Sequence, residues 1–134
     1  MSKIINGRTI SKGIVLGEVL MSKDAISFLG GINPKNGICE ELGHCLYGKC
    51  ISGKILVFPS GKGSTVGSYV MLQLSKNNKA PLAIINVSAE PIIAVGAIIS
   101  NIAMIDNLEQ DPFTFLQDGM QIKVDADNGF IELQ

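Results

Sequence analysis

Short apolar runs, several of them rich in β-branched residues, recur along this chain and predict buried strands. The runs 53–59 (GKILVFP) and 80–88 (APLAIINVS) have the length and composition of such strands. The stretch 14–22 (IVLGEVLMS) mixes apolar and small residues and predicts another strand, with Gly17 inside it. The shorter run AMID, which begins at Ala103, predicts a fourth.

A helix is predicted after the run 53–59. Val66, Val70 and Leu74 fall at positions i, i+4 and i+8 of the stretch VGSYVMLQLSKNN. Tyr69 and its apolar neighbours widen this stripe almost all the way round. We therefore expect a well-buried helix that ends at the asparagine pair 77–78.

The remaining stretches predict a second helix, a hairpin and loops. Pro91 suits the first turn of a short helix, although the pattern of 89–102 (AEPIIAVGAIISNI) also fits a strand. The stretch 118–133 shows Asp-Gly, alternation in MQIKV and then Asp-Asn-Gly, which is typical of a terminal β-hairpin. The stretch 26–37 (ISFLGGINPKNG) has the glycine, proline and asparagine content of loops. Strands at both ends, with strand–helix–strand–helix between them, predict an α/β fold with a mixed sheet.

Length and composition exclude several classes of protein. A chain of 134 residues fits one domain, residues 1–134, and 46% hydrophobic residues suffice for a core. A net charge of −1 and only 5% aromatic residues disfavour nucleic-acid binding. No apolar run approaches the roughly 20 residues of a membrane span, and the first residues lack the apolar segment of a signal peptide. We expect a cytoplasmic protein that binds neither nucleic acid nor membrane.

The stretch 58–70 (FPSGKGSTVGSYV) is the candidate for chemistry. It is not a nucleotide P-loop, because Lys62 precedes Gly63 instead of following it. A glycine-rich turn into a helix start still directs free N–H groups and the positive end of the helix dipole at an anion. Two interpretations stay open at this point. Ser64 or Thr65 caps the helix, or Ser64 acts as a base, which requires a dry site with several N–H donors.

The cysteines and the single histidine predict no metal site in this chain. Cys39, Cys45 and Cys50 are separated by five and four residues, unlike the two-residue spacing common in iron–sulfur motifs. His44 adjoins Cys45 but lacks the paired cysteines of a zinc motif. An odd number of cysteines in a cytosolic protein also argues against disulfides. We expect three reduced, partly buried cysteines and a surface or interface position for His44.

Three stretches together resemble the small subunit of the aconitase X family: 26–37, 53–70 (GKILVFPSGKGSTVGSYV) and 79–102 (KAPLAIINVSAEPIIAVGAIISNI). The resemblance runs from about Gly13 to the hairpin, and GKGSTVGSY is its most specific motif. It implies a single swivelling β/β/α domain, the counterpart of the mobile last domain of aconitase-type enzymes.

The resemblance also implies a role for Ser64. This residue matches the serine that acts as catalytic base in the Gly-x-Gly-Ser-Ser-Arg pattern of aconitase-type enzymes. Val66 stands where that pattern has arginine, which argues against di- and tricarboxylates gripped in that way. In this family a separate large subunit carries the iron–sulfur cluster, so the implied cofactor is not held by this chain.

The archaeal branch of the family implies a reaction, the dehydration of (R)-5-phosphomevalonate to trans-anhydromevalonate 5-phosphate in a mevalonate pathway to isoprenoids. The substrate would be a small phosphorylated hydroxy acid, and the partner would be the large subunit, in a heterodimer or a larger complex. Lys62 could equally be a solvated charge, and Thr65 a helix cap. Substrate contacts are expected around Ser64 from the glycine-rich loop and from the SFLGG motif, namely Lys62, Gly63, Thr65, Ser27, Gly30 and Gly31.

Two alternatives remain at this level. The first is the bacterial branch of the same family, whose two-subunit enzymes dehydrate hydroxyproline. The second is a stand-alone, non-enzymatic swivel domain that binds an anion or another protein. The enzyme interpretations predict an exposed apolar face around the loop that a partner subunit covers, whereas a stand-alone domain predicts a stable monomer.

Overall fold

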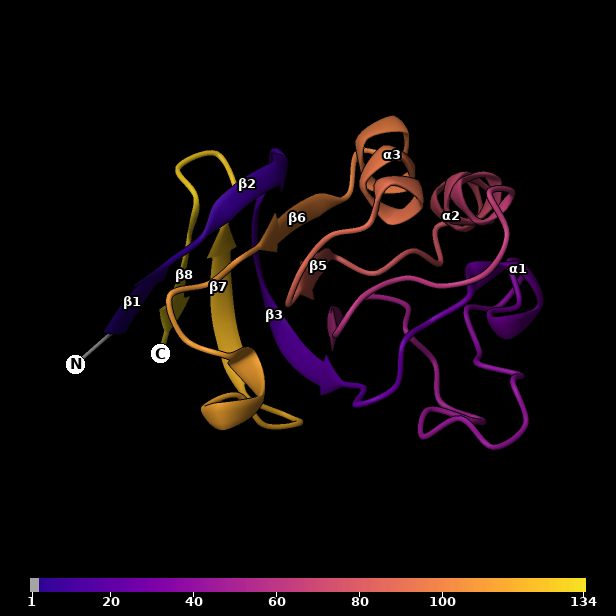
Figure 1. Cartoon of the computed structure of the whole chain (residues 1–134), viewed down its shortest axis with the longest axis horizontal. Helices are drawn as coiled ribbons and strands as arrows, with labels where there is room; N and C mark the ends of the chain where they lie inside the picture. Colours follow the sequence, from indigo (N-terminus) through magenta and orange to yellow (C-terminus); the bar gives the residue numbers. More distant parts are fainter. Residues whose placement is uncertain (1–2) are drawn as a thin grey trace.

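The computed structural model describes residues 3–134, and its strands form one mixed sheet flanked by helices (Figure 1). The strands lie in the order β1-β8-β7-β3-β4-β5-β6-β2, with β3 to β6 parallel to one another and the other pairs antiparallel. The strands are β1 (Lys3–Asn6), β2 (Arg8–Ser11), β3 (Ile14–Met21), β4 (Ile55–Phe58), β5 (Ala83–Asn86), β6 (Ala103–Asp106), β7 (Gln121–Asp125) and β8 (Phe130–Leu133). The helical segments are α1 (Phe28–Gly31), α2 (Gly67–Lys76), α3 (Pro91–Ile99) and the short 3₁₀ turn η1 (Pro112–Thr114).

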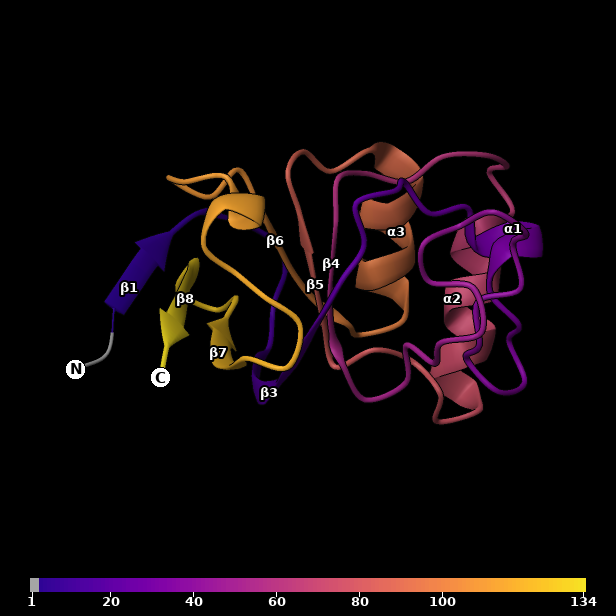
Figure 2. The ribbon, with the colours of Figure 1, turned by 90° about the horizontal axis from the view of Figure 1, so that it is seen from below.

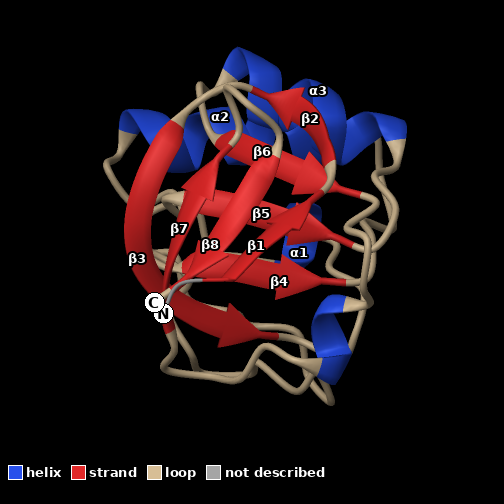
Figure 3. Cartoon of the chain, turned by 90° about the vertical axis from the view of Figure 1, so that its left-hand side faces the viewer, coloured by secondary structure: helices blue, strands red, loops and turns tan. Residues whose placement is uncertain are grey.

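The sheet is strongly curled because its two edge strands are consecutive in the chain. Only Gly7 separates β1 from β2, so the two edges of the sheet must approach each other, as Figure 3 shows. The Gly7 N–H donates to the carbonyl of Gly129 at 2.8 Å. The Thr9 hydroxyl donates to the carbonyl of Ala126 at 2.7 Å. These bonds tie the β1–β2 segment to the β7–β8 turn.

The molecule has three layers. Helices α2 and α3 cover one face of the parallel strands, and the antiparallel strands β1, β7 and β8 lie on the other side (Figure 2). In β4, Leu56 and Phe58 belong to the core against the helices, whereas Ile55 and Val57 belong to the core against the antiparallel strands. Strands buried on both faces read as continuous apolar runs, which is the pattern that the sequence shows here.

Most of the predicted elements are confirmed. The strands at 14–22, 53–59, 80–88 and 103–106, the helix that begins at Pro91 and the terminal hairpin are all present. The mixed α/β fold is confirmed as well. Strands β1 and β2 were not predicted, because each has only four residues and charged or polar side chains interrupt its apolar ones. Within residues 3–134, no helix is long and apolar enough to cross a membrane.

The prediction for α2 was wrong for Val66 and Tyr69. Val66, the first residue of the predicted apolar stripe, precedes the helix and is 45% exposed. The helix does bury Val70 and Leu74 and ends at Asn77, as expected. The side chain of Tyr69, however, is 63% exposed, so the helix is not covered all round. Tyr69 lies in the first turn of the helix, next to the loop that contains Ser64, whereas Gly67, Ser68 and Val70 in the same turn are buried.

The segment α1 is in substance a β-turn inside the loop predicted for 26–37. Leu29 (φ −72°, ψ 119°) and Gly30 (φ 82°, ψ −16°) have non-helical angles that match the two central positions of a type II turn. A positive φ at the second central position favours glycine, and Gly30 supplies it. Phe28 is buried at the start of this turn and anchors it to the core.

Candidate active site

The candidate site lies where the parallel strands end. The β4 strand ends at Phe58 and continues into the loop 59–66, and β5 ends at Asn86 just before α3. In open α/β sheets, ligands bind outside the carboxyl ends of the strands, because the loops there converge. The loop 59–66 is therefore in the position that this architecture uses for ligands.

Contacts from β5 and α3 hold this loop. The buried Asn86 side chain donates from Nδ2 to the carbonyl of Phe58 at 3.0 Å, and its Oδ1 has no partner within the described residues. The Val87 N–H donates to the carbonyl of Pro59 at 3.1 Å. An ideal Cβ on Gly61 would overlap Ile93 and lie 2.7 Å from Glu90 Oε1. Only glycine lets the loop pass this close to the start of α3.

A second loop, which carries the SFLGG motif, lies beside the first. Ile26 pairs with Gly61 in a parallel bridge, and the Lys62 N–H donates to the carbonyl of Ile26 at 3.0 Å. Gly63 has φ +91°, and a Cβ there would overlap the hydroxyl of Ser27. The structure thus brings Ser27 against the glycine-rich loop, although Ser27 lies 37 positions before Ser64 in the chain.

Ser64 is partly buried and lies just before α2. Its Oγ accepts a hydrogen bond from the Val66 N–H at 3.1 Å. The predicted cap was wrong, since Val66 occupies the N-cap position of the helix and neither Ser64 nor Thr65 does. Ser64 nevertheless lies at the start of α2, where one backbone N–H bonds its Oγ and the helix dipole is positive. Both effects favour negative charge on its oxygen.

Lys62 extends to a third loop. Its Nζ lies 3.0 Å from Glu41 Oε2, and both side chains are partly exposed. The other carboxylate oxygen of Glu41 is 3.5 Å from the position of a Cβ on Gly31. Glu41 was not a sequence candidate, because nothing in its local pattern marks a residue 21 positions before Lys62 as its partner. The positive charge of Lys62 is therefore next to the site but already paired.

The other residues predicted to contact substrate differ in how they are placed around Ser64. Ser27 uses its hydroxyl within the turn, donating to the carbonyl of Leu29 at 3.0 Å. Gly31 is buried beneath Glu41, whereas Gly30 is exposed with nothing within 4 Å of a Cβ built on it. Thr65 is exposed next to Ser64. The six residues proposed to contact substrate therefore border one region, but Gly30 and Thr65 lie at its open side.

Three exposed apolar side chains lie in or beside these loops. Leu29 in the turn is 44% exposed, Val66 before α2 is 45% exposed, and Tyr69 follows in the first turn of the helix. Gly67 packs against this turn, with its ideal Cβ 3.7 Å from Phe28 Cβ. An apolar rim of Leu29, Val66 and Tyr69 around polar loops is typical of a surface that another protein covers.

The residues Asp24, His44 and Cys45 are close enough to suggest a metal, since one ligand atom from each lies within 4.8 Å of the others. The hydrogen bonds of His44 argue otherwise. Its Nδ1 accepts from the Leu46 N–H and its Nε2 lies against the carbonyl of Ala25, both at 3.0 Å. Neither nitrogen has a free lone pair, so this histidine joins two loops.

His44 was expected at a surface or interface position; the surface alternative was wrong, since the residue is only 7% exposed. It is buried because both ring nitrogens have backbone partners. The three cysteines are free. They were expected to be partly buried, but Cys39 is buried and Cys45 and Cys50 are exposed.

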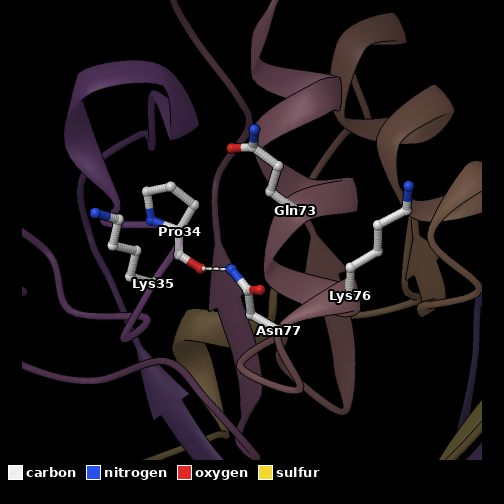
Figure 4. A pocket seen from close by; sticks show the side chains of 5 residues that line it. All are labelled: Pro34, Lys35, Gln73, Lys76 and Asn77. Atoms are coloured by element: carbon white, nitrogen blue, oxygen red, sulfur yellow. Dashed lines mark hydrogen bonds between the residues drawn. The ribbon is translucent and has the colours of Figure 1, made fainter.

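A shallow pocket lies at the far end of α2 from Ser64 (Figure 4). Its wall includes a hydrogen bond from Asn77 Nδ2 to the carbonyl of Pro34 at 2.8 Å. The amines of Lys35 and Lys76 point away from each other in Figure 4, so they do not form an anion site. The pocket is lined by Pro34, Lys35, Gln73, Lys76 and Asn77.

Comparison with known proteins assigns the family. The family model of the aconitase X swivel domain matches residues 4–133. This chain belongs to the aconitase X swivel domain family. A crystal structure of the holo-form of Thermococcus kodakaraensis aconitase X superposes with a TM-score of 0.93 at 50% identity, covering 98% of each chain.

Two curated relatives of this swivel domain are both named phosphomevalonate dehydratase small subunit. The protein from Methanosarcina mazei is 61% identical over 95% of this chain and 88% of its own length. The protein from Methanococcoides burtonii is 58% identical over 96% of this chain and 94% of its own length. The predicted family and fold are thereby confirmed.

Proposed function

We propose that this chain is the small subunit of a two-subunit hydro-lyase that dehydrates (R)-5-phosphomevalonate to trans-anhydromevalonate 5-phosphate. The near-full-length similarity to archaeal proteins named phosphomevalonate dehydratase small subunit carries this proposal. The same names do not favour the hydroxyproline alternative. The site agrees with the phosphomevalonate proposal, because the loop offers one serine at a helix start and one lysine to an anionic substrate. The cytoplasmic location stays a prediction.

In this proposal, Ser64 accepts the proton α to the substrate carboxylate. A serine hydroxyl is far too weak an acid to be ionised in water, so its alkoxide needs stabilisation from the protein. The Val66 N–H donates to Ser64 Oγ at 3.1 Å, and the positive end of the α2 dipole lies next to it. Val66 offers no positive charge, so the carboxylate would be held by other groups.

Lys62 and the glycine loop would hold the substrate. An ammonium group with three N–H donors suits a phosphate, and Lys62 has donors left beside the one that bonds Glu41. Gly63 lets the backbone beside Ser64 pack directly against Ser27. Gly31, Gly30, Thr65 and Ser27 border the same region and would complete the contacts.

We further propose that a large subunit covers this face and carries an iron–sulfur cluster. The apolar rim of Leu29, Val66 and Tyr69 supports the partner. The cysteines of this chain do not fit as cluster ligands, because the metal-like group within residues 3–134 contains a single cysteine, Cys45, beside Asp24 and a histidine with both nitrogens bonded. A cluster in the large subunit would supply a Lewis acid for the leaving hydroxyl.

The test is co-expression with the large subunit, anaerobic purification and a dehydration assay with (R)-5-phosphomevalonate. Ser64→Ala should lower kcat by at least about a thousandfold, as expected for loss of a base, while the complex still assembles. The matched control is Ser75→Ala, which removes a hydroxyl at the other end of α2. Near-normal turnover by Ser64→Ala would refute the role of base. A lone monomer that recruits no subunit would support the stand-alone domain instead.

A further inference from the structure

Glu41 is the residue through which a third loop reaches the candidate site. Its Oε2 lies 3.0 Å from Lys62 Nζ, and its other oxygen lies over Gly31 of the SFLGG motif. The Lys62 side chain is 48% exposed and that of Glu41 is 31% exposed. This single carboxylate therefore contacts both of the loops that border Ser64.

The loop that carries Glu41 is anchored on both sides. The Glu40 N–H donates to the carbonyl of Gly31 at 2.7 Å, and the His44 N–H donates to the carbonyl of Glu41 at 3.2 Å. His44 is itself buried and joined to Ala25 and Leu46. Glu41 thus extends from a backbone that is fixed relative to the SFLGG turn.

A lysine side chain loses up to about 2 kcal/mol of rotamer entropy when it is held in one position. Glu41 already limits the positions of Lys62 in the unliganded protein, so less of this entropy is lost when an anion binds. The carboxylate occupies one N–H of the ammonium group and leaves two for a ligand. The opposing effect is repulsion between the carboxylate and an anionic substrate, which is weakened because both groups are partly in water.

We propose that Glu41 is a positioning residue that holds the Lys62 amine ready for the phosphate group of the substrate. This inference rests on the proposed function, because it takes a phosphorylated hydroxy acid as the ligand. Glu41 acts only through Lys62, so its effect must disappear when Lys62 is removed.

A double-mutant cycle in the two-subunit complex tests this dependence. Glu41→Ala should raise KM for (R)-5-phosphomevalonate by about two- to fivefold, the range of a partly exposed ion pair, with little change in kcat. Glu41→Gln keeps an acceptor and should fall between the wild type and Glu41→Ala. In a Lys62→Ala background, Glu41→Ala should change KM no further.

The control is Glu40→Ala, which removes the same charge from the adjacent position. Glu40 Oε2 accepts from Asn33 Nδ2 at 3.1 Å and has no link to Lys62. The KM of the Glu40→Ala complex should stay at the wild-type value, which would exclude a general effect of the loop's negative charge on substrate binding.

A second readout needs no turnover. The rate at which an acylating reagent modifies Lys62, followed by peptide mass spectrometry of the same complexes, should rise in Glu41→Ala and stay unchanged in Glu40→Ala. Equal rates in all three proteins would overturn the inference. An unchanged or lower KM in Glu41→Ala would also overturn it. The same would follow if Glu41→Ala raised KM by the same factor in the Lys62→Ala background as in the wild type. A wild-type complex that leaves phosphomevalonate unchanged would refute the proposed function, and the modification rates would still decide the role of Glu41.

Discussion

The packing of the two site loops can be tested by adding one methyl group at Gly63. This residue has φ +91°, and an ideal Cβ on it would overlap Ser27 Oγ and lie 3.1 Å from Ser27 Cβ. Gly63→Ala therefore has two costs, one from the backbone and one from the collision. Gly30→Ala is the matched control, because Gly30 has φ +82° but nothing within 4 Å of its Cβ.

The expected magnitudes follow from these two costs. A non-glycine residue in the left-handed region loses about 1–2 kcal/mol. Forcing an extra carbon into a packed contact costs a further 1–3 kcal/mol, roughly. Gly63→Ala should thus lower the free energy of unfolding by about 2–5 kcal/mol, against about 1–2 kcal/mol for Gly30→Ala.

Urea denaturation followed by circular dichroism measures both losses. Ser27→Ala alone should cost about 1 kcal/mol, because it removes the bond from its hydroxyl to the carbonyl of Leu29. In the Gly63→Ala background it should instead recover part of the stability, since the colliding oxygen is gone. Equal losses in Gly63→Ala and Gly30→Ala, or no recovery in the double variant, would mean that the two loops do not pack as described.

Two further predictions concern side chains outside the site. The backbone N–H of Cys45 lowers the pKa of Asp24 below its ordinary value of 3.8, so Asp24 stabilises the fold above about pH 4 and this contribution is lost as pH falls through the lowered pKa. The Asp24→Asn variant should accordingly unfold at a lower urea concentration than the wild type at pH 7. The prediction would be contradicted if the difference between the two urea midpoints did not become smaller below pH 4. Burial raises the pKa of the Cys39 thiol, so iodoacetamide at pH 8 should label Cys45 and Cys50 at least about tenfold faster than Cys39, as peptide mass spectrometry would show; equal labelling would count against the buried position.

The middle of the fold could be predicted because its signals are local. Buried runs such as 53–59 and the proline at position 91 determine strand or helix with little help from the rest of the chain. The strands β1 and β2 could not be found in this way. Each has four residues, and they become strands by pairing with β8 and β6, more than 90 positions away in the sequence.

The same distinction applies to the site. The motif around Ser64 is contiguous, so its place between strand and helix was predictable. The pairing of Lys62 with Glu41, the contact of Gly63 with Ser27 and the burial of His44 depend on which loops meet. No periodicity of the sequence encodes such contacts between loops. The sequence-based expectations placed Ser27 and Gly63 around the same site, but they included neither the Lys62–Glu41 pair nor the burial of His44.

The geometry also explains why this chain would need a partner to use Ser64 as a base. An alkoxide is stable only where water is excluded, yet Ser64 is partly exposed and receives one backbone N–H. Leu29, Val66 and Tyr69 around it expose apolar surface to water, which is unfavourable until another surface covers it. Covering this rim would remove water from Ser64 in the same step. The contact that stabilises an assembly would therefore also complete the environment that the serine requires.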